Sequence, residues 1–235
     1  MARIRRRCGA APRRGALRPR RTRGAARARA ARRGGGGAPV KRLCDLAGSL
    51  VLLALLSPVL AVIALAIVID SRGPVFYRQE RIGRGGAPFR IFKFRTMVVD
   101  AEHKGLGLAV AADDERITRV GRVLRRWSLD ELPQLLNVVA GDMSIVGPRP
   151  TVASQVERYD DFQRRRLEAL PGITGWAQVN GRNDLPWERR IEFDVWYVDH
   201  RSLARDFVIL MRTPAALLGK RGVYGGDGVT KDLGE

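Results

Sequence analysis

Residues 46–69 read LAGSLVLLALLSPVLAVIALAIVI, an uncharged run of 24 residues between Asp45 and Asp70. About 20 apolar residues suffice to cross the hydrocarbon core of a bilayer, so length alone predicts a membrane helix. A buried core helix is disfavoured, because so long an uninterrupted apolar run exceeds what a small domain needs. The stretch therefore predicts a membrane protein.

Two features argue against a straight crossing. Ser57-Pro58 lies at the middle of the run, where proline removes a backbone hydrogen bond and the serine hydroxyl can partly satisfy the freed carbonyl. Both flanks are also basic, with Lys41 and Arg42 before the run and seven Lys or Arg against one acid in residues 71–95. Because basic flanks favour the cytoplasmic side, a broken helix that enters and leaves on one face satisfies both. A kinked helix that crosses once is the alternative.

The formal net charge of +19 suggests a nucleic-acid binder, but most of it lies in one segment. Residues 1–40 contain fourteen Arg and no Lys, Asp or Glu, which leaves a net +5 on the rest of the chain. Such a segment buries too little apolar surface to fold, so we predict a disordered tail. It reads as an anchor to anionic lipids, a nucleic-acid arm, a transit peptide or an extension before the true start, and not as a secretory signal. Two cysteines and two histidines disfavour a disulfide framework and a structural zinc site.

Two further elements follow the membrane segment. The runs 75–77 and 89–94 flank Gly83-Arg84-Gly85-Gly86, which predicts a β-hairpin. Residues 116–127 then place apolar side chains at helical spacing between arginines and end at Trp127. This pattern suits an amphipathic helix in the lipid headgroup layer, although a surface helix packed on a core reads similarly.

The candidate chemical centre is SLDELPQLLNV at residues 128–138. Ser128 and Glu131 have capping-box spacing, whereas a helix that starts at Asp130 keeps Pro133 within its first turn. In either case Asp130 and Glu131 lie near the positive end of a helix, where anions also bind. One carboxylate can attack phosphorus while the other holds Mg²⁺, which prefers one or two carboxylates plus substrate phosphates. Simple capping by two acids is the structural alternative.

Two segments strengthen this interpretation. Pro148 and Pro150 restrict the backbone on either side of Arg149, and a rigid arginine suits bidentate phosphate recognition. PGITGWAQVNGRN at residues 171–183 offers amides, a tryptophan and an arginine for a base and sugar hydroxyls. Tight structural turns are the alternative for both segments.

In these motifs the chain resembles the bacterial polyprenyl-phosphate glycosyl-1-phosphate transferases, a monotopic sugar-transferase superfamily, in its short form. The resemblance covers about residues 41–224. It rests on Lys41-Arg42, Ser57-Pro58, KFRTM (93–97), residues 128–150, residues 171–183 and WYVDHRSLARDFVILMRT (196–213). No single motif is specific, but their combination in this order is.

The resemblance implies that a UDP-sugar donates sugar-1-phosphate to undecaprenyl phosphate and releases UMP. It also implies a re-entrant helix broken at Ser57-Pro58, Asp130 as nucleophile, and Glu131 as its partner and Mg²⁺ ligand. The substrate-binding candidates that it implies are Lys93, Arg95, Arg125, Arg149, Gln178, Asn180 and Arg182.

We therefore expect an α+β, helix-rich monotopic membrane protein with a small hairpin and interfacial amphipathic helices. The expected divisions are a tail (1–40), a re-entrant helix (41–70), a catalytic domain (71–224) and a flexible C-terminal tail (225–235). The catalytic domain is expected on the cytoplasmic face of a bacterial inner membrane, with anionic lipids as further partners. The alternatives are a membrane-tethered nucleic-acid binder that uses the arginine tail, an ordinary glycosyltransferase or phosphatase, and an inactive scaffold. The sugar, the pathway and a homo-oligomeric state stay open.

Overall fold

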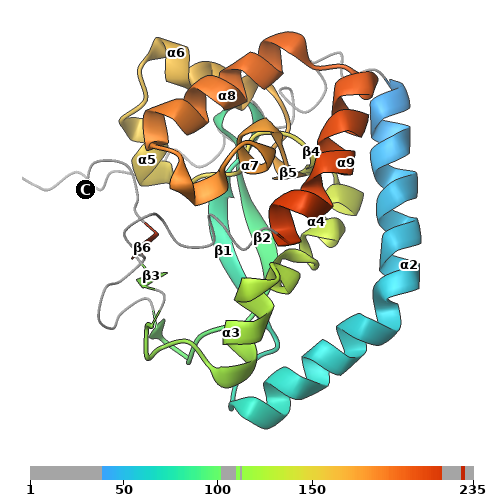
Figure 1. The fold of residues 1–235 in the computed structure, drawn as a ribbon, viewed down its shortest axis with the longest axis vertical. Helices are drawn as coiled ribbons and strands as arrows, with labels where there is room; N and C mark the ends of the chain where they lie inside the picture. The colour runs from blue at the N-terminus through green and yellow to red at the C-terminus, as the bar shows by residue number, and fades with distance from the viewer. Residues whose placement is uncertain (1–38, 102–109, 112, 219–228, 231–235) are drawn as a thin grey trace, which may run out of the picture.

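The computed structural model describes residues 39–101, 110–111, 113–218 and 229–230. Figure 1 shows a long helix, α2 (Pro39–Asp70), along one side of a helix-rich body that holds a small antiparallel hairpin. The helix-rich α+β class is thus confirmed for the described part of the chain. Residues 1–38 and most of 225–235, where the tails were predicted, lie outside the described residues.

Helix α2 is the one helix in the described part that is long and apolar enough to cross a membrane, and 11% of its most apolar window is buried. It starts at Pro39, so residues 39–40 belong to the helix rather than to the tail predicted over 1–40. Pro58 lies inside it, and Ser57 Oγ donates to the Ala54 carbonyl at 2.8 Å. Ala54 is the residue whose carbonyl a proline at 58 leaves without its backbone donor, so the predicted serine compensation is present. Figure 1 shows α2 bent near its middle.

The predicted hairpin is present, with longer strands than the sequence pattern indicated. β1 (Phe76–Ile82) pairs antiparallel with β2 (Pro88–Phe94), and the short helix η1 (Arg84–Gly86) forms the turn. Gly85 and Gly86 have φ of 67° and 77°, left-handed values at which glycine carries no Cβ penalty. The inner face of β2 packs against helix α4 (Gln134–Ala140) through Phe89, Ile91 and Val138.

Helix α3 spans Arg119–Arg126 and begins at Thr118, whose side chain accepts a hydrogen bond from the Gly121 amide at 3.0 Å. The predicted start at residue 116 was wrong. Arg116 is buried and its guanidinium binds the Asp114 carboxylate, so it precedes the helix and does not face headgroups. At Gly121 an added Cβ would lie 2.0 Å from the Thr96 carbonyl oxygen, so only glycine lets α3 approach the backbone after β2 this closely.

The predicted capping box is absent. Ser128 has left-handed backbone angles (φ 54°, ψ 26°) and caps nothing with its side chain. The short helix η3 (Leu129–Glu131) follows it, and α4 begins only after Pro133. The left-handed turn at Ser128 separates α3 from η3, and η3 packs against β2. The alternative that keeps Pro133 near a helix start was closer to the structure.

The rest of the described chain adds two more strand pairs and a series of helices. β4 (Ser144–Val146) pairs parallel with β5 (Gly172–Thr174), and β3 (Val110–Ala111) pairs with β6 (Val229–Thr230). Residues 229–230, which were expected in a flexible tail, thus form a strand that is hydrogen-bonded to β3. The helices are α5 (Ala153–Glu157), α6 (Asp161–Arg164), η4 (Arg165–Glu168), α7 (Trp176–Val179), η5 (Arg182–Asp184), α8 (Trp187–His200) and α9 (Leu203–Leu218).

Both ends of α2 are attached to this body. Near the N-terminal end, the Asp45 carboxylate accepts hydrogen bonds from the Ile145 amide at 3.1 Å and the Ser144 hydroxyl at 2.7 Å. At the other end, Asp70 Oδ2 accepts from the Val120 amide at 3.0 Å, in the first turn of α3. The C-terminal half of α2 also buries Ile63 and Ile67 in an apolar cluster with Phe94 of β2 and Leu124 of α3. One domain therefore holds both ends of the apolar helix.

Candidate active site

A cavity of about 530 Å³ lies where the hairpin, η3 and the helices of the C-terminal half meet. Eight of the nine residues predicted for catalysis or substrate binding line it, although they come from separate segments of the chain. They are Lys93, Arg95, Arg125, Asp130, Glu131, Arg149, Gln178 and Arg182, so only Asn180 of the predicted set is missing. The long-range fold, rather than any local motif, brings them together.

Asp130 lies in η3 and is 9% exposed. Among the described residues, its carboxylate has no hydrogen-bond or ion-pair partner. Burial raises the pKa of Asp130 above its ordinary value, although Lys93 opposes this, and the neighbouring Glu131 charge raises it further. An unpartnered carboxylate that faces a cavity has its lone pairs free to attack an electrophile.

Glu131 has the opposite environment. Lys93 Nζ lies 3.0 Å from its Oε1, and Arg149 donates from Nη2 to Oε1 at 2.5 Å and from Nη1 to Oε2 at 3.2 Å. Burial alone would raise the pKa of Glu131, but the charges and hydrogen bonds of Arg149 and Lys93 outweigh it and hold that pKa far below the usual range. Adjacent residues thus form two different groups, one free carboxylate and one firmly ionised and paired carboxylate.

Arg149 is set by the turn that follows β4. At Gly147 an added Cβ would lie 2.3 Å from the Leu170 carbonyl oxygen, so β4 and the β5 segment pack backbone to backbone there. Pro148 and Pro150 then restrict φ on both sides of Arg149. The Arg149 carbonyl accepts from Arg166 Nη2 at 2.9 Å. The side chain is half exposed toward the cavity, and its guanidinium can meet both Glu131 and an incoming anion.

The remaining predicted residues divide by what they contact. Arg125 Nε donates to Thr96 Oγ1 at 2.8 Å, and Arg182 Nη2 donates to Ser128 Oγ at 2.8 Å, which ties it to the turn before Asp130. Gln178 is half-buried at the cavity wall, and its two side-chain amide atoms are buried without a partner among the described residues. Buried polar atoms without partners mark positions where a ligand is expected to complete the hydrogen bonding.

Two predicted residues have other contacts. Arg95 donates through Nη1 to the Arg72 carbonyl at 2.5 Å and through Nη2 to the Ser71 carbonyl at 2.7 Å, so its terminal nitrogens hold the end of α2. Asn180 donates to the Trp176 carbonyl at 2.7 Å, because it lies at the C-terminal cap of α7, and it does not line the cavity. The sequence does not distinguish these tasks from phosphate or sugar binding.

Arg166, Asp194 and Trp187 also line the cavity, and none of the three was predicted. Arg166 Nη2 pairs with Asp194 Oδ2 at 2.6 Å, while Asp194 Oδ1 and Trp187 Nε1 are buried with no partner in the part of the chain that the structure describes. Burial raises the pKa of Asp194 to about 6, against the opposing charge of Arg166. A signal was available for Asp194, since it falls within the apolar stripe of α8 beside Ile191 and Val195. Arg166 reads from sequence as part of a solvated basic run.

The donor set for Mg²⁺ is small. Within the described ranges, no group of three or more His, Cys, Asp or Glu side chains is placed to hold a metal ion. Two adjacent carboxylates do border the cavity, and Mg²⁺ takes one or two carboxylates when substrate phosphates supply further oxygens. The residues therefore fit an ion that is bound together with a diphosphate, and do not fit a site built from protein side chains alone.

The comparisons with known proteins identify the family. Residues 37–220 match the model described as "Bacterial sugar transferase", so the chain belongs to this family. The expectation drawn from the motifs is thereby confirmed at the level of the family.

Relatives with known names agree with this assignment. "Uncharacterized sugar transferase EpsL" of Bacillus subtilis is 43% identical over 82% of this chain and 94% of its own length. "Exopolysaccharide production protein ExoY" of Rhizobium meliloti is 40% identical over 80% of this chain and 89% of its own length. "UDP-glucose:undecaprenyl-phosphate glucose-1-phosphate transferase" of Caulobacter vibrioides is 43% identical over 78% of this chain and 72% of its own length. Neither the family nor these names support the nucleic-acid alternative.

Proposed function

We propose that this protein is a phosphoglycosyl transferase that moves sugar-1-phosphate from a UDP-sugar to undecaprenyl phosphate, with UMP as the second product. One observation carries the proposal. At one cavity, a buried Asp130 carboxylate without a partner among the described residues lies beside a Glu131 carboxylate that is bound by two cations, Lys93 and Arg149. The Caulobacter relative is named for this reaction with UDP-glucose, and the relative ExoY for exopolysaccharide production. The reaction would begin the assembly of a lipid-linked glycan.

The first step is a displacement at phosphorus. An oxygen of Asp130 attacks the phosphorus that bears the sugar, the bond between that phosphorus and the bridging oxygen breaks, and UMP leaves with the electron pair. A phosphosugar is then bound to Asp130 as an acyl phosphate. Arg149 and Lys93 are placed to neutralise the charge that builds on the phosphoryl oxygens, which is where preorganised cations lower a barrier.

The second step returns the enzyme to its starting state. An oxygen of undecaprenyl phosphate attacks the phosphorus of the adduct, the bond from phosphorus to the Asp130 oxygen breaks, and the carboxylate is free again. Arg125 and Arg182 line the same cavity and supply further positive charge for the lipid phosphate and the diphosphate product. Gln178 would complete its unmet hydrogen bonds on the uncharged part of the donor.

Glu131 is the residue that would hold Mg²⁺, in company with the phosphate oxygens of the donor. When bound, the ion supplies charge neutralisation at the diphosphate. Glu131 is suited to this task because its low pKa keeps it ionised. Arg149 and Lys93 already contact its oxygens, so the diphosphate must draw one of these cations toward itself when the ion is present.

The membrane arrangement is also a proposal. A re-entrant α2 is supported by the attachment of both of its ends to one domain, at Asp45 and at Asp70, and by the bend beside Pro58. A helix that crosses once would carry one of these attachments to the opposite face. The basic flanks of α2 favour the cytoplasmic face of the inner membrane for the domain. Exposed apolar side chains of α9, among them Phe207 and Met211, suit contact with the lipid surface.

Product identity tests the proposed reaction. Purified protein in nanodiscs with undecaprenyl phosphate and Mg²⁺ is supplied with a panel of UDP-sugars, and nucleotide products are separated by chromatography. Release of UMP with formation of a lipid diphosphate sugar supports the proposal. UDP as product would indicate an ordinary glycosyltransferase, and no nucleotide with any donor would indicate a scaffold.

A further inference from the structure

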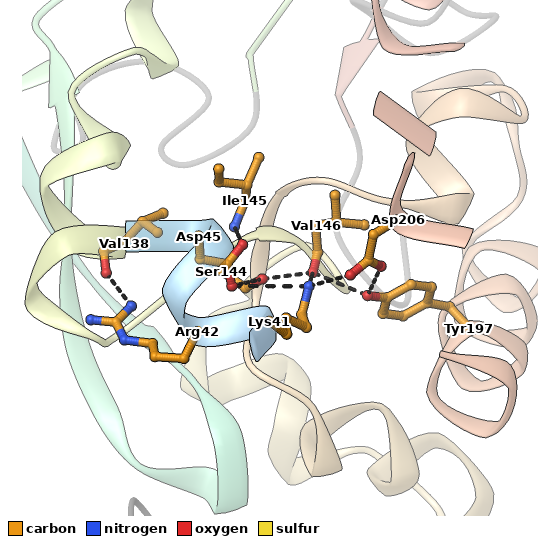
Figure 2. Close-up of polar contacts among 9 residues, drawn as sticks. All are labelled: Lys41, Arg42, Asp45, Val138, Ser144, Ile145, Val146, Tyr197 and Asp206. Atoms are coloured by element: carbon orange, nitrogen blue, oxygen red, sulfur yellow. Dashed lines mark hydrogen bonds and ion pairs between the residues drawn. The ribbon is translucent and has the colours of Figure 1, made fainter. Parts of the chain in front are cut away.

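The N-terminal turns of α2 carry three charged side chains that point into the body rather than away from it. Figure 2 shows Lys41, Arg42 and Asp45 reaching β4 and the end of α4. Arg42 donates to the carbonyls of Val138 and Val139 at 2.6 and 3.0 Å, which caps the C-terminus of α4. These contacts are specific, whereas a segment that only marks membrane orientation needs positive charge alone.

Lys41 is the centre of this group. Its ammonium lies 2.6 Å from Asp206 Oδ2 on α9 and 3.3 Å from the carbonyl oxygen of Val146, the last residue of β4. Its side chain is 22% exposed and that of Asp206 is 10% exposed, so the pair is poorly screened by solvent. Tyr197 joins from α8, with its hydroxyl 2.6 Å from Asp206 Oδ1 and 3.2 Å from the Val146 carbonyl.

A count of protons shows which donor serves Val146. Burial and the nearby Asp206 carboxylate raise the pKa of Tyr197, so its hydroxyl keeps its single proton and gives it to Asp206, the closer acceptor. The Ser144 hydroxyl also has one proton, and its shorter contact is to Asp45 at 2.7 Å rather than to Val146 at 3.0 Å. Lys41 has three protons, enough for both Asp206 and Val146. The Val146 carbonyl therefore depends on Lys41.

Val146 is the base of the turn that carries Arg149. The next residue, Gly147, donates its amide to the Thr174 carbonyl at 2.9 Å, and two prolines enclose Arg149. Because these residues have little backbone freedom, a shift at Val146 is transmitted to the guanidinium. Arg149 meets Glu131 with a bidentate geometry that a shift of about 1 Å would break.

We propose that Lys41 and Asp206 are positioning residues that hold the Val146 carbonyl and thereby keep Arg149 on Glu131. The membrane helix is then part of the support of the active site as well as an anchor, since Lys41 lies in its first turn. This inference rests on the proposed function, in which Arg149 acts on the phosphoryl group.

Three variants separate positioning from general support. Asp206→Asn and Lys41→Met each remove the ion pair, from different helices, and are expected to lower kcat for UMP release about 10- to 100-fold while the protein stays folded in the membrane. Lys41→Arg keeps the charge and is expected to retain most of the rate. The control Asp199→Asn removes a carboxylate from an exposed pair with Arg165, at the end of α8, and is expected to leave the rate unchanged.

The decisive measurement is a double-mutant cycle with Arg149→Ala. If Lys41 and Asp206 act through Arg149, Asp206→Asn lowers kcat in the wild-type background and has little further effect once Arg149 is absent. Equal fold losses in both backgrounds would show that Asp206 supports the fold in general, and would overturn the inference. Wild-type kcat in both Asp206→Asn and Lys41→Met would overturn it equally.

Hydrogen exchange keeps the inference separate from the proposed reaction. In nanodiscs, the amides of residues 144–150 are expected to exchange faster in Asp206→Asn than in the wild type and in Asp199→Asn. Unchanged exchange in this segment would contradict the inference. A wild-type protein that releases no UMP from any donor would overturn the proposed function alone, and the exchange result would still decide whether Lys41 and Asp206 hold the turn.

Discussion

The guanidinium of Arg149 holds the carboxylate of Glu131 through both of its terminal nitrogens, at 2.5 and 3.2 Å. The two residues are 18 positions apart in the chain, and β4 and its proline-bounded turn bring them together. This pair keeps Glu131 ionised, whereas the adjacent Asp130 carboxylate has no partner among the described residues. The division of tasks between neighbouring acids is the basis of the predictions below.

Replacing Arg149 by lysine is expected to lower kcat for UMP release about 100-fold, with a small effect on stability. Lysine keeps the charge but loses the planar fork that meets Glu131 and a phosphoryl group at once. Steady-state kinetics with a fixed UDP-sugar measure the change. Arg189→Lys is the matched control, because Arg189 forms an exposed pair with Glu192 away from the cavity. An Arg149→Lys variant with wild-type kcat would show that bidentate contact is not needed.

Chelation of divalent ions is expected to stop UMP release without unfolding the protein. The described residues hold no cluster able to bind a metal by protein side chains alone, so the ion is expected to bind with the diphosphate and to contribute nothing to folding. Activity with and without EDTA, and circular dichroism of the same samples, measure both effects. Added Mg²⁺ should restore activity. Unchanged turnover after complete chelation would remove Mg²⁺ from the account.

Asp194 predicts a pH dependence of stability. Its pKa is about 6 in the folded protein, against about 3.9 for an ordinary aspartate, so the folded state retains this proton to higher pH than the unfolded state. The stability that this gives is fully present below pH 4 and is lost as the pH rises through 6. The difference amounts to about 3 kcal/mol. Unfolding free energies of wild type and Asp194→Asn between pH 4 and 7 measure it.

The wild type is expected to lose stability relative to Asp194→Asn over this range, since asparagine does not titrate. Subtracting the two curves removes the contribution of all other groups. A difference between the curves that stays constant, or that grows in favour of the wild type as the pH rises, would contradict the raised pKa of Asp194.

Cysteine labelling tests the re-entrant topology. Cys44 is exposed near the N-terminal end of α2, and Glu80 is exposed in β1 beyond its C-terminal end. In the variant Cys8→Ser, Cys44 is the one remaining cysteine and reports the N-terminal flank. In the variant that combines Cys8→Ser, Cys44→Ser and Glu80→Cys, the new cysteine at position 80 reports the C-terminal flank. A membrane-impermeant maleimide should label both flanks only from the cytoplasmic side. Labelling of the two flanks from opposite sides would establish a helix that crosses once.

The sequence predicts the local elements well where one physical pattern dominates. The hairpin was predicted because aromatic and β-branched runs flank a glycine turn, and both strands formed there. The Ser57 contact with Ala54 was predicted because proline at 58 frees one known carbonyl. Predictions failed where tertiary contacts override local preference. Ser128 turns left-handed instead of capping, and Arg116 pairs with Asp114 inside the body instead of starting a helix.

The site shows the same division. The motifs predicted eight residues that line the cavity, but not which of their polar atoms are already bound within the protein. The terminal nitrogens of Arg95 and the side-chain amide of Asn180 donate to backbone carbonyls, a task that chemistry alone does not distinguish from ligand binding. Arg166 and Asp194 come together from η4 and α8, and that pairing depends on how the two elements pack. Long-range packing is the information that a single sequence does not display.

The proposed mechanism depends most directly on a covalent bond between Asp130 and the phosphosugar. Wild-type protein and Asp130→Asn are incubated with UDP-sugar and Mg²⁺ in nanodiscs that lack undecaprenyl phosphate, quenched in acid, and analysed by intact mass and by peptide mapping. The account predicts about one UMP released per wild-type molecule, a mass increase of one sugar phosphate on the peptide that contains Asp130, and neither signal in a folded Asp130→Asn protein. Lipid-dependent turnover at the wild-type rate by that variant, or UMP release that requires the lipid and leaves no adduct, would contradict it.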